Sequence, residues 1–260
     1  DQAPEFEDRV AELKAIAGGH TATQGAFDLP AINRTLVRNV ESKNFGRDRI
    51  DFRTLRINKR FHDELSVERP KIRRLDAWFF HLAEGVDAHA RRQWSNPAWD
   101  PSERFSSLPE TWNAPGVVEA ELVFPGLVGI HCTGMKEADF RDWKSRIGGA
   151  PKLVWSPTSN LLLYGKTVDQ LNRGGSSRLF RTDRQVLELV TTNPAKILGW
   201  EQEVGRLLPG YHADVLVTDK LHRSGYRSLI LAREEHVQLV LVGGEPLYGD
   251  EAHLRRLKVY

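Results

Sequence analysis

Two apolar runs near the middle of the chain each lead into a histidine, and this pattern constrains the fold more than any other feature of the sequence. Residues 79–85 have the sequence FFHLAEG, and residues 128–132 have the sequence VGIHC. Both runs have the composition of buried strands, and strand-like segments alternate with helix-like ones between residues 20 and 200. This alternation predicts an α/β fold with a parallel sheet.

The position of the two histidines also indicates chemistry. In parallel barrels and doubly wound sheets, the carboxyl ends of the strands surround the reaction site. His81 and His131 lie at such ends, and Glu84 follows His81 by three residues. Imidazoles there can hold a metal, and a carboxylate close by can carry a proton. The alternatives are buried histidines that cap their strands and a glutamate that favours the start of a helix.

Composition and charge exclude several classes of protein. The 260 residues carry a formal net charge of +2, and Cys132 is the only cysteine, so neither an internal disulfide nor a cysteine-based zinc site is possible. We expect Cys132 to serve in packing. Two short basic clusters, at 71–74 and 255–258, are typical of solvated faces rather than of nucleic-acid binding.

No apolar run approaches the length of about 20 residues that spans a membrane. The first residues, DQAPEFED, are acidic and unlike a signal peptide. We therefore expect a cytoplasmic protein with a small-molecule substrate, and with neither a membrane nor a nucleic acid as partner.

The segments predict two domains. Residues 1–200 are expected to form the catalytic domain, and residues 201–260 a small β-rich domain, because the turn-rich stretch 205–210 is followed by strand-like runs. Helices are expected at 6–17, 59–74, 86–95, 136–147 and 183–192, with Asp183 as N-cap and a further helix starting at Pro194. Strands are expected at 35–40, 48–57, 76–81, 126–131, 152–155, 213–218 and 237–242, and 117–122 is either a helix or a short strand.

The stretch 96–113 is rich in proline, serine and tryptophan and is predicted to be a long loop. Its aromatic residues Trp99, Phe105 and Trp112 either line a pocket for a flat ring or cover the mouth of the barrel.

Seven strings in order along the chain resemble those of the amidohydrolase superfamily, in particular its aminohydrolase and deaminase branch. They are 18–25 (GGHTATQG), 36–41 (LVRNVE), 81–85 (HLAEG), 129–131 (GIH), 155–163 (WSPTSNLLL), 192–199 (TNPAKILG) and 205–217 (GRLLPGYHADVLV).

The resemblance implies a (β/α)8 TIM-type barrel, possibly incomplete, with a small C-terminal β-sandwich domain. It implies that His81 is a metal ligand at the end of the fifth strand and that Glu84 shuttles the proton. It implies that His131, at the end of the sixth strand, binds metal or polarises the attacked carbon. Asn160, near the end of the seventh strand, is given a structural role. The implied cofactor is a divalent metal, zinc first and iron second, and a homo-oligomer is possible.

The sequence departs from the family pattern in three places. His20 replaces a threonine, and we interpret it as structural. The family's His-x-His would precede residue 11, and its eighth-strand aspartate would fall between Asn160 and Asp183, where only Asp169 occurs. About 22 residues are too few for a strand, helix and second strand, which take roughly 30. The chain thus either joins pieces of a longer protein or is a degraded member.

Three hypotheses follow. The first is a metal-dependent hydrolase that cleaves C–N bonds, by deamination or amide-type hydrolysis, in a small polar nitrogen-containing molecule. The second is a non-catalytic scaffold or binding protein that has lost its metal ligands. The third is a metal-free barrel enzyme with another chemistry, since a fold alone does not fix function.

Overall fold

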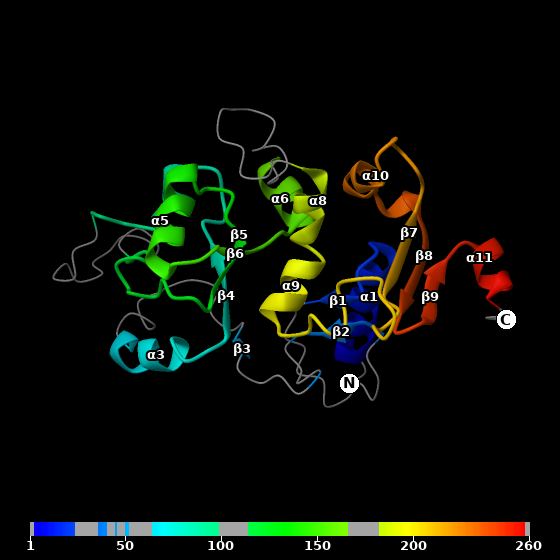
Figure 1. Ribbon diagram of the computed structural model, residues 1–260, viewed down its shortest axis with the longest axis horizontal. Coiled ribbons are helices and arrows are strands. Elements are labelled where there is room, and N and C mark those ends of the chain that lie inside the picture. Colours follow the sequence, from blue (N-terminus) through cyan, green and yellow to red (C-terminus); the bar gives the residue numbers. More distant parts are fainter. Residues whose placement is uncertain are drawn as a thin grey trace. The chain divides into compact units, whose positions relative to one another are not determined.

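The computed structural model describes residues 3–23, 36–40, 45, 50–51, 64–98, 114–165 and 182–257 (Figure 1). The chain divides into two compact units. One contains residues 49–197, and the other joins residues 1–48 to residues 198–260. The expected boundary at residue 200 lies beside the division at 197/198, whereas residues 1–48 group with the tail. The assignment of the two domains as a catalytic barrel and a β-rich domain stays a prediction.

A four-stranded parallel sheet forms the centre of the unit 49–197. Its strands, in spatial order, are β3 (Ile50–Asp51), β4 (Ala77–Leu82), β5 (Leu127–His131) and β6 (Lys152–Val154). All five residues of β5 are buried, as are five of the six in β4. Continuous apolar runs of this kind are typical of parallel strands that are covered on both faces.

Helices of the same unit follow the strands. They are α3 (Leu65–Ile72), α4 (Ala88–Arg92), α5 (Glu137–Ile147), α6 (Pro157–Tyr164), α8 (Asp183–Glu188) and α9 (Thr192–Ile197). Trp143 of α5 packs against Gly129 of β5, where an added Cβ would lie 3.1 Å from its ring. The ring of Trp94 lies 5.6 Å from that of Trp143, between centroids. These tryptophans fill the space between helix and sheet.

Several local predictions need correction. Thr182, not Asp183, is the N-cap of α8. Its hydroxyl oxygen accepts from the Gln185 N–H, and the Gln185 side-chain oxygen accepts from the Thr182 N–H. Pro194 is the third residue of α9 rather than its first. Asn160 lies inside helix α6 and not at a strand end.

The segment 117–122 is neither a helix nor a strand but a hydrogen-bonded turn. The Glu119 carboxylate accepts from the N–H groups of Asn96 and Gly116, which anchors the start of the turn. Glu121 has a φ of 56°, and a left-handed residue at this position ends any helical continuation.

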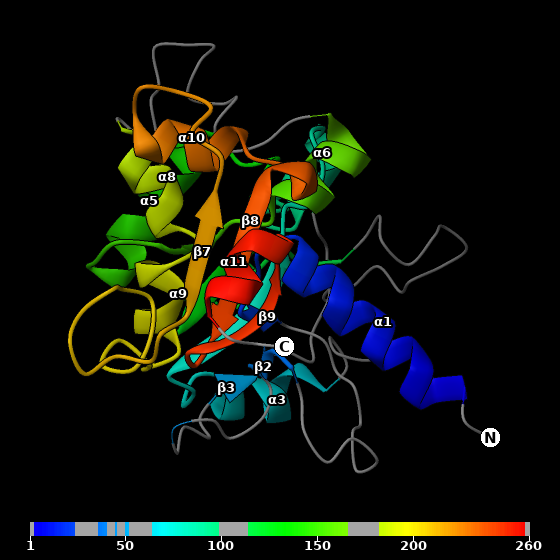
Figure 2. The same cartoon turned by 90° about the vertical axis from the view of Figure 1, so that its right-hand side faces the viewer.

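The second unit contains α1 (Ala3–Ala17) and two sheets. The short strands β1 (Ala22–Thr23) and β2 (Arg38–Asn39) are parallel. The strands β7 (Val215–Thr218), β8 (Val237–Val242) and β9 (Glu245–Gly249) form an antiparallel sheet, visible in Figure 2. The remaining elements are α10 (Gly225–Leu231), the 3-10 helix η2 (Glu234–His236) and α11 (Glu251–Arg256).

The two ends of the sequence share a small core in this unit. Ile16 and Val37 pack with Val237 and Val240, and all four side chains are buried. Arg38 pairs with Asp214, whose carboxylate also accepts from the Gly243 N–H at 2.8 Å. These contacts explain why residues 1–48 group with the tail.

The parallel sheet confirms the α/β class. Within the described residues the sheet has four parallel strands, so the closed eight-stranded barrel stays a prediction, as does the β-sandwich. Of the helices that the structure describes, none combines the length and the apolar character needed to cross a bilayer.

Candidate functional site

His81 and His131 lie on neighbouring strands and face a common space. The register of β4 and β5 pairs His81 with Ile130 and Leu82 with His131, so the histidines are one residue out of step. Regular alternation of side chains would therefore place them on opposite faces of the sheet. Their rings are nevertheless 5.2 Å apart, between centroids. The expected convergence of the two imidazoles is confirmed.

The backbone at His131 explains how the rings meet. His131 has a φ of 68°, and the Cys132 N–H donates to the Ile130 carbonyl at 2.9 Å. Together these features define a γ-turn with positive φ, which is rare and strained. The same N–H also donates to the Leu82 carbonyl at 2.9 Å, which fixes the turn to β4. Strain of this kind persists where the surrounding structure over-determines it, commonly at functional sites.

Glu84 enters the same space from the loop that follows β4. Its carboxylate Oε1 lies 3.4 Å from His131 Nε2, and the side chains are 25% and 3% exposed respectively. One ligand atom from each of His81, Glu84 and His131 lies within 4.8 Å of the others. The structure thus brings together all three residues that the sequence predicts for the site.

Hydrogen bonds lock the loop after β4 to the loop after β5. The Ala83 carbonyl accepts from the Gly134 N–H at 2.9 Å and from the Thr133 hydroxyl at 3.3 Å. The Gly85 N–H donates to Thr133 Oγ1 at 3.1 Å. Ala83 itself has a φ of 50°. These bonds hold the residues before and after Glu84, so the backbone that carries its carboxylate is rigid.

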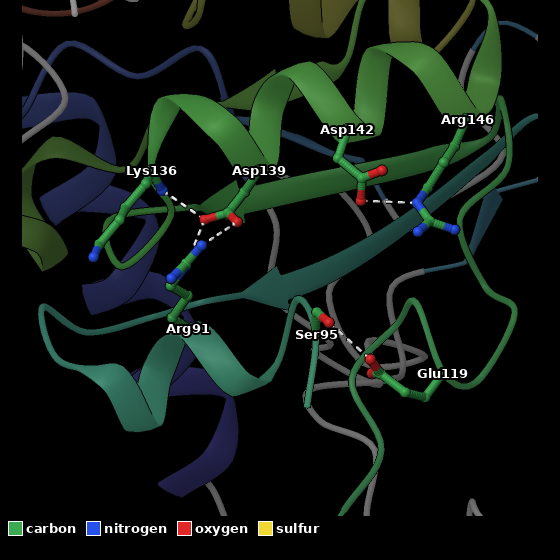
Figure 3. Close-up of polar contacts among 7 residues, drawn as sticks. All are labelled: Arg91, Ser95, Glu119, Lys136, Asp139, Asp142 and Arg146. Atoms are coloured by element: carbon green, nitrogen blue, oxygen red, sulfur yellow. Dashed lines mark hydrogen bonds and ion pairs between the residues drawn. The ribbon is translucent and has the colours of Figure 1, made fainter. Parts of the chain in front are cut away.

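A second set of contacts ties the helices that follow these loops (Figure 3). Arg91 of α4 donates from Nε and an Nη atom to the Asp139 carboxylate of α5, at 2.8 and 2.7 Å. Asp139 also accepts from the Lys136 N–H at 2.7 Å, which caps α5. Burial is the largest single influence on Asp139 and raises the pKa of its carboxyl. The hydrogen bonds from Arg91 and from the Lys136 N–H, with the charges of both residues, outweigh burial, so the pKa is lowered. Asp87 caps α4 by accepting from the Ala90 N–H.

Asn160 contacts the site, although the sequence suggested only a structural role for it. Its Oδ1 lies 2.7 Å from His131 Nδ1, and the residue is fully buried. An amide oxygen can only accept, so His131 carries its proton on Nδ1. The lone pair of Nε2 then points to the space shared with Glu84. The sequence separation of Asn160 and His131 does not predict this contact, because the contact depends on how α6 packs.

His81 is held in the neutral form. Burial lowers the pKa of its imidazole, the neighbouring His131 lowers it further, and Glu84 acts in the opposite direction. Its Nδ1 is buried and, within the described part of the chain, has no hydrogen-bond partner. A neutral imidazole with a free nitrogen is the state in which histidine binds metals.

The two imidazoles fit a divalent ion, and the Glu84 carboxylate lies close enough either to bind it or to reach its water. Bonds of about 2.1 Å in a tetrahedral arrangement place donor atoms about 3.4 Å apart, which is compatible with the observed cluster. Two imidazoles and one carboxylate are donors that zinc and iron accept. The remaining candidate of the sequence, Asp169, lies outside the described residues, as do Trp99, Phe105 and Trp112.

Two other residues considered from the sequence are not part of the cluster. Cys132 is buried, and an added Cβ on Gly129 would lie 2.5 Å from its sulfur, so its predicted packing role is confirmed. Burial raises the pKa of the Cys132 thiol, which keeps it protonated. His20 places Nδ1 3.2 Å from the Ala15 carbonyl at the end of α1, which agrees with a structural role.

Comparison with known proteins gives a partial match to one family and a likeness in fold. The family model described as the amidohydrolase family matches residues 166–247. An adenosine deaminase from Xanthomonas campestris with bound zinc superposes with a TM-score of 0.56 at 14% identity, over 98% of this chain and 74% of that one. This likeness concerns the fold and is consistent with the α/β barrel. No curated protein sequence matches the chain significantly.

Two more solved structures are similar over parts of their length. The guanine deaminase of E. coli has a TM-score of 0.42 and 20% identity, over 72% of this chain and 51% of that one. A mutant atrazine chlorohydrolase from Arthrobacter aurescens, complexed with zinc and atraton, has a TM-score of 0.47 and 14% identity, over 98% and 76%. The chain therefore spans about half to three quarters of the length of these proteins.

Proposed function

We propose that the chain is a member of the amidohydrolase superfamily and a metal-dependent hydrolase that cleaves a C–N bond in a small, polar, nitrogen-containing molecule. The observation that supports this proposal is the convergence of His81, Glu84 and His131 at the carboxyl ends of adjacent parallel strands. Deamination and amide-type hydrolysis are the two reactions in view.

In this proposal His81 and His131 hold the ion through nitrogen lone pairs. His81 is neutral because of its burial, and His131 presents Nε2 because Asn160 occupies Nδ1. A bound divalent ion supplies Lewis-acid activation and lowers the pKa of water towards about 7. Zinc is the first metal to test, because the adenosine deaminase structure contains it, and iron is the second.

Glu84 is the proton carrier of the proposed reaction. A carboxylate at hydrogen-bonding reach of the attacking water accepts its proton as the C–O bond forms. The same group then donates that proton to the nitrogen as the C–N bond breaks, so ammonia or an amine leaves neutral. His131 Nε2 lies 3.4 Å from Glu84 Oε1, and the alternative role of His131, in place of metal binding, is to polarise the attacked carbon.

The experiment measures metal and activity on the same preparation. Purified protein is analysed for bound zinc and iron, and ammonia release is followed on a panel of amino-substituted heterocycles and small amides. We expect about one ion per chain and turnover of at least one compound. Glu84→Gln is expected to lower turnover at least 100-fold while metal stays bound, whereas His81→Ala is expected to lose metal as well.

A protein without bound metal, and without activity after loading with zinc or iron, would contradict the proposal. That result would favour the alternative, a non-catalytic scaffold or binding protein. The substrate class, a cytoplasmic location and a homo-oligomeric state accompany the proposal as further predictions.

A further inference from the structure

Thr133 lies in the loop that follows β5 and reaches across to the loop that follows β4. The Met135 N–H donates to the Cys132 carbonyl at 3.2 Å, so Thr133 and Gly134 are the central residues of a turn. Thr133 is only 6% exposed, and bulk water therefore has little access to its side chain. The turn thus presents a buried hydroxyl to the neighbouring loop.

That hydroxyl binds both of the peptide units that flank Glu84. It donates to the Ala83 carbonyl at 3.3 Å, which belongs to the unit before Glu84. It accepts from the Gly85 N–H at 3.1 Å, which belongs to the unit after Glu84. One hydroxyl can do both, because its oxygen carries a donor hydrogen and two acceptor lone pairs. Since peptide units are planar, holding two successive units restrains φ and ψ of the residue between them, and with them the direction in which its side chain leaves the backbone.

The two peptide units depend on the hydroxyl to different degrees. The Ala83 carbonyl also accepts from the Gly134 N–H at 2.9 Å, so the unit before Glu84 keeps an anchor without the hydroxyl. Among the described residues, the hydrogen-bond partner of the Gly85 N–H is Thr133. Loss of the hydroxyl is therefore expected to free the unit after Glu84 and to change ψ of Glu84 more than φ.

The two loops are in close contact around the hydroxyl. An added Cβ on Gly134 would lie 3.2 Å from the Ala83 carbonyl oxygen and 3.3 Å from that of Gly85. A methyl group in place of the hydroxyl would fill the same space and exclude water, so the Gly85 N–H would lose its partner. Because a buried N–H without a partner is costly, we expect the loop to move until this group is satisfied.

We propose that Thr133 is a positioning residue whose hydroxyl aims the Glu84 carboxylate at His131 and at the reacting water. Glu84 Oε1 lies 3.4 Å from His131 Nε2, and Thr133 follows His131 by two residues. The hydroxyl therefore ties the proton carrier to the loop that begins at this histidine. The inference rests on the proposed function and adds to it a residue outside the predicted site. It assigns the role to the hydroxyl and not to the shape of the side chain.

The test compares Thr133→Val, which keeps the shape and removes the hydroxyl, with Thr133→Ser, which keeps the hydroxyl. We expect Thr133→Val to lower kcat about tenfold, with KM and metal content within about twofold of wild type, because only the aim of Glu84 is lost. Thr133→Ser should keep kcat within about threefold of wild type. In a Glu84→Ala background, Thr133→Val should cause no further loss, since the hydroxyl acts through Glu84.

Thr191→Val is the matched control. The Thr191 hydroxyl donates to the Leu187 carbonyl at 2.9 Å, so this substitution also removes a hydroxyl that binds the backbone. Its kcat should stay within about twofold of wild type.

Crystal structures of the wild type and of Thr133→Val give a readout that does not need activity. We expect Glu84 Oε1 within hydrogen-bonding reach of His131 Nε2 in the wild type and displaced from it in the variant. An unmoved carboxylate would overturn the inference. So would equal losses of kcat in Thr133→Val and Thr133→Ser, or a raised KM at unchanged kcat. If Thr133→Val does not fold, Thr133→Ala, which also lacks the hydroxyl, takes its place and is judged by the same outcomes.

Failure of the proposed function is distinct from failure of this inference. It would appear as an inactive, metal-free wild type, in which the displacement of Glu84 by Thr133→Val can still be measured.

Discussion

The backbone of Gly129 in β5 lies against the Cys132 side chain, and replacing Gly129 by alanine tests how tightly the turn at His131 is packed. An added Cβ would lie 2.5 Å from Cys132 Sγ and 3.1 Å from Cη2 of Trp143. Cys132 is 2% exposed and Trp143 fully buried, so neither side chain has space to move into. Overpacking of a filled core costs about 1–3 kcal/mol, and the short sulfur contact leads us to expect about 2 kcal/mol for Gly129→Ala.

A second substitution identifies the cause of that loss. Cys132→Ala removes the sulfur and alone is expected to cost about 1 kcal/mol, because one buried group and its contacts are lost. If the sulfur contact causes the strain, the double variant loses less than the two single variants together. We expect a coupling free energy of about 1–2 kcal/mol.

Urea unfolding of the four proteins, followed by circular dichroism, measures these free energies. Losses that add within about 0.5 kcal/mol would refute the reasoning, since they would show that the alanine at 129 is accommodated without reference to Cys132.

Three further predictions concern the site and its supports. Asn160→Leu leaves His131 Nδ1 unpaired and is expected to weaken metal affinity about 10–100-fold, measured by competition with a chelator; unchanged affinity would contradict the contact's role. Burial and His131 lower the pKa of His81 below 6.5, so the unfolded chain binds the proton more readily than the folded chain does. In metal-free protein, the stability that His81 contributes is therefore complete above pH 6.5 and is lost as the pH falls through the pKa of the folded state. Urea midpoints between pH 7.5 and 5.0 measure that loss, and a slope identical in His81→Gln would disprove it. Asp139→Ala is expected to lower the free energy of unfolding by about 2 kcal/mol and Arg91→Ala by less, since the first also removes the cap of α5; equal losses would show that the cap contributes nothing.

The sequence predicted the strands that carry the site well, because their apolar runs have few alternatives. Residues 79–82 and 127–131 are too short and too apolar for surface helices, and each leads to a histidine at a strand end. Adjacency of the parallel strands brings His81 and His131 to the same edge of the sheet, but the turn at His131 is what directs both rings into one space.

The details that aim the side chains could not be predicted in the same way. The local sequence does not mark His131 as a left-handed residue, because histidine adopts positive φ more often than most residues but still uncommonly. The contact of Asn160 depends on how α6 packs, which is a long-range property. The N-cap at Thr182, in contrast, is marked locally, because Thr182 and Gln185 form a Thr-x-x-Gln capping box.

The division of the chain has a consequence for synthesis. Ile16 and Val37 emerge from the ribosome long before Val237 and Val240, with which they form a core. Domains generally fold as units while the nascent chain lengthens. The intervening unit can therefore complete its fold first, while the side chains of Ile16 and Val37 stay uncovered until the last strands are synthesised.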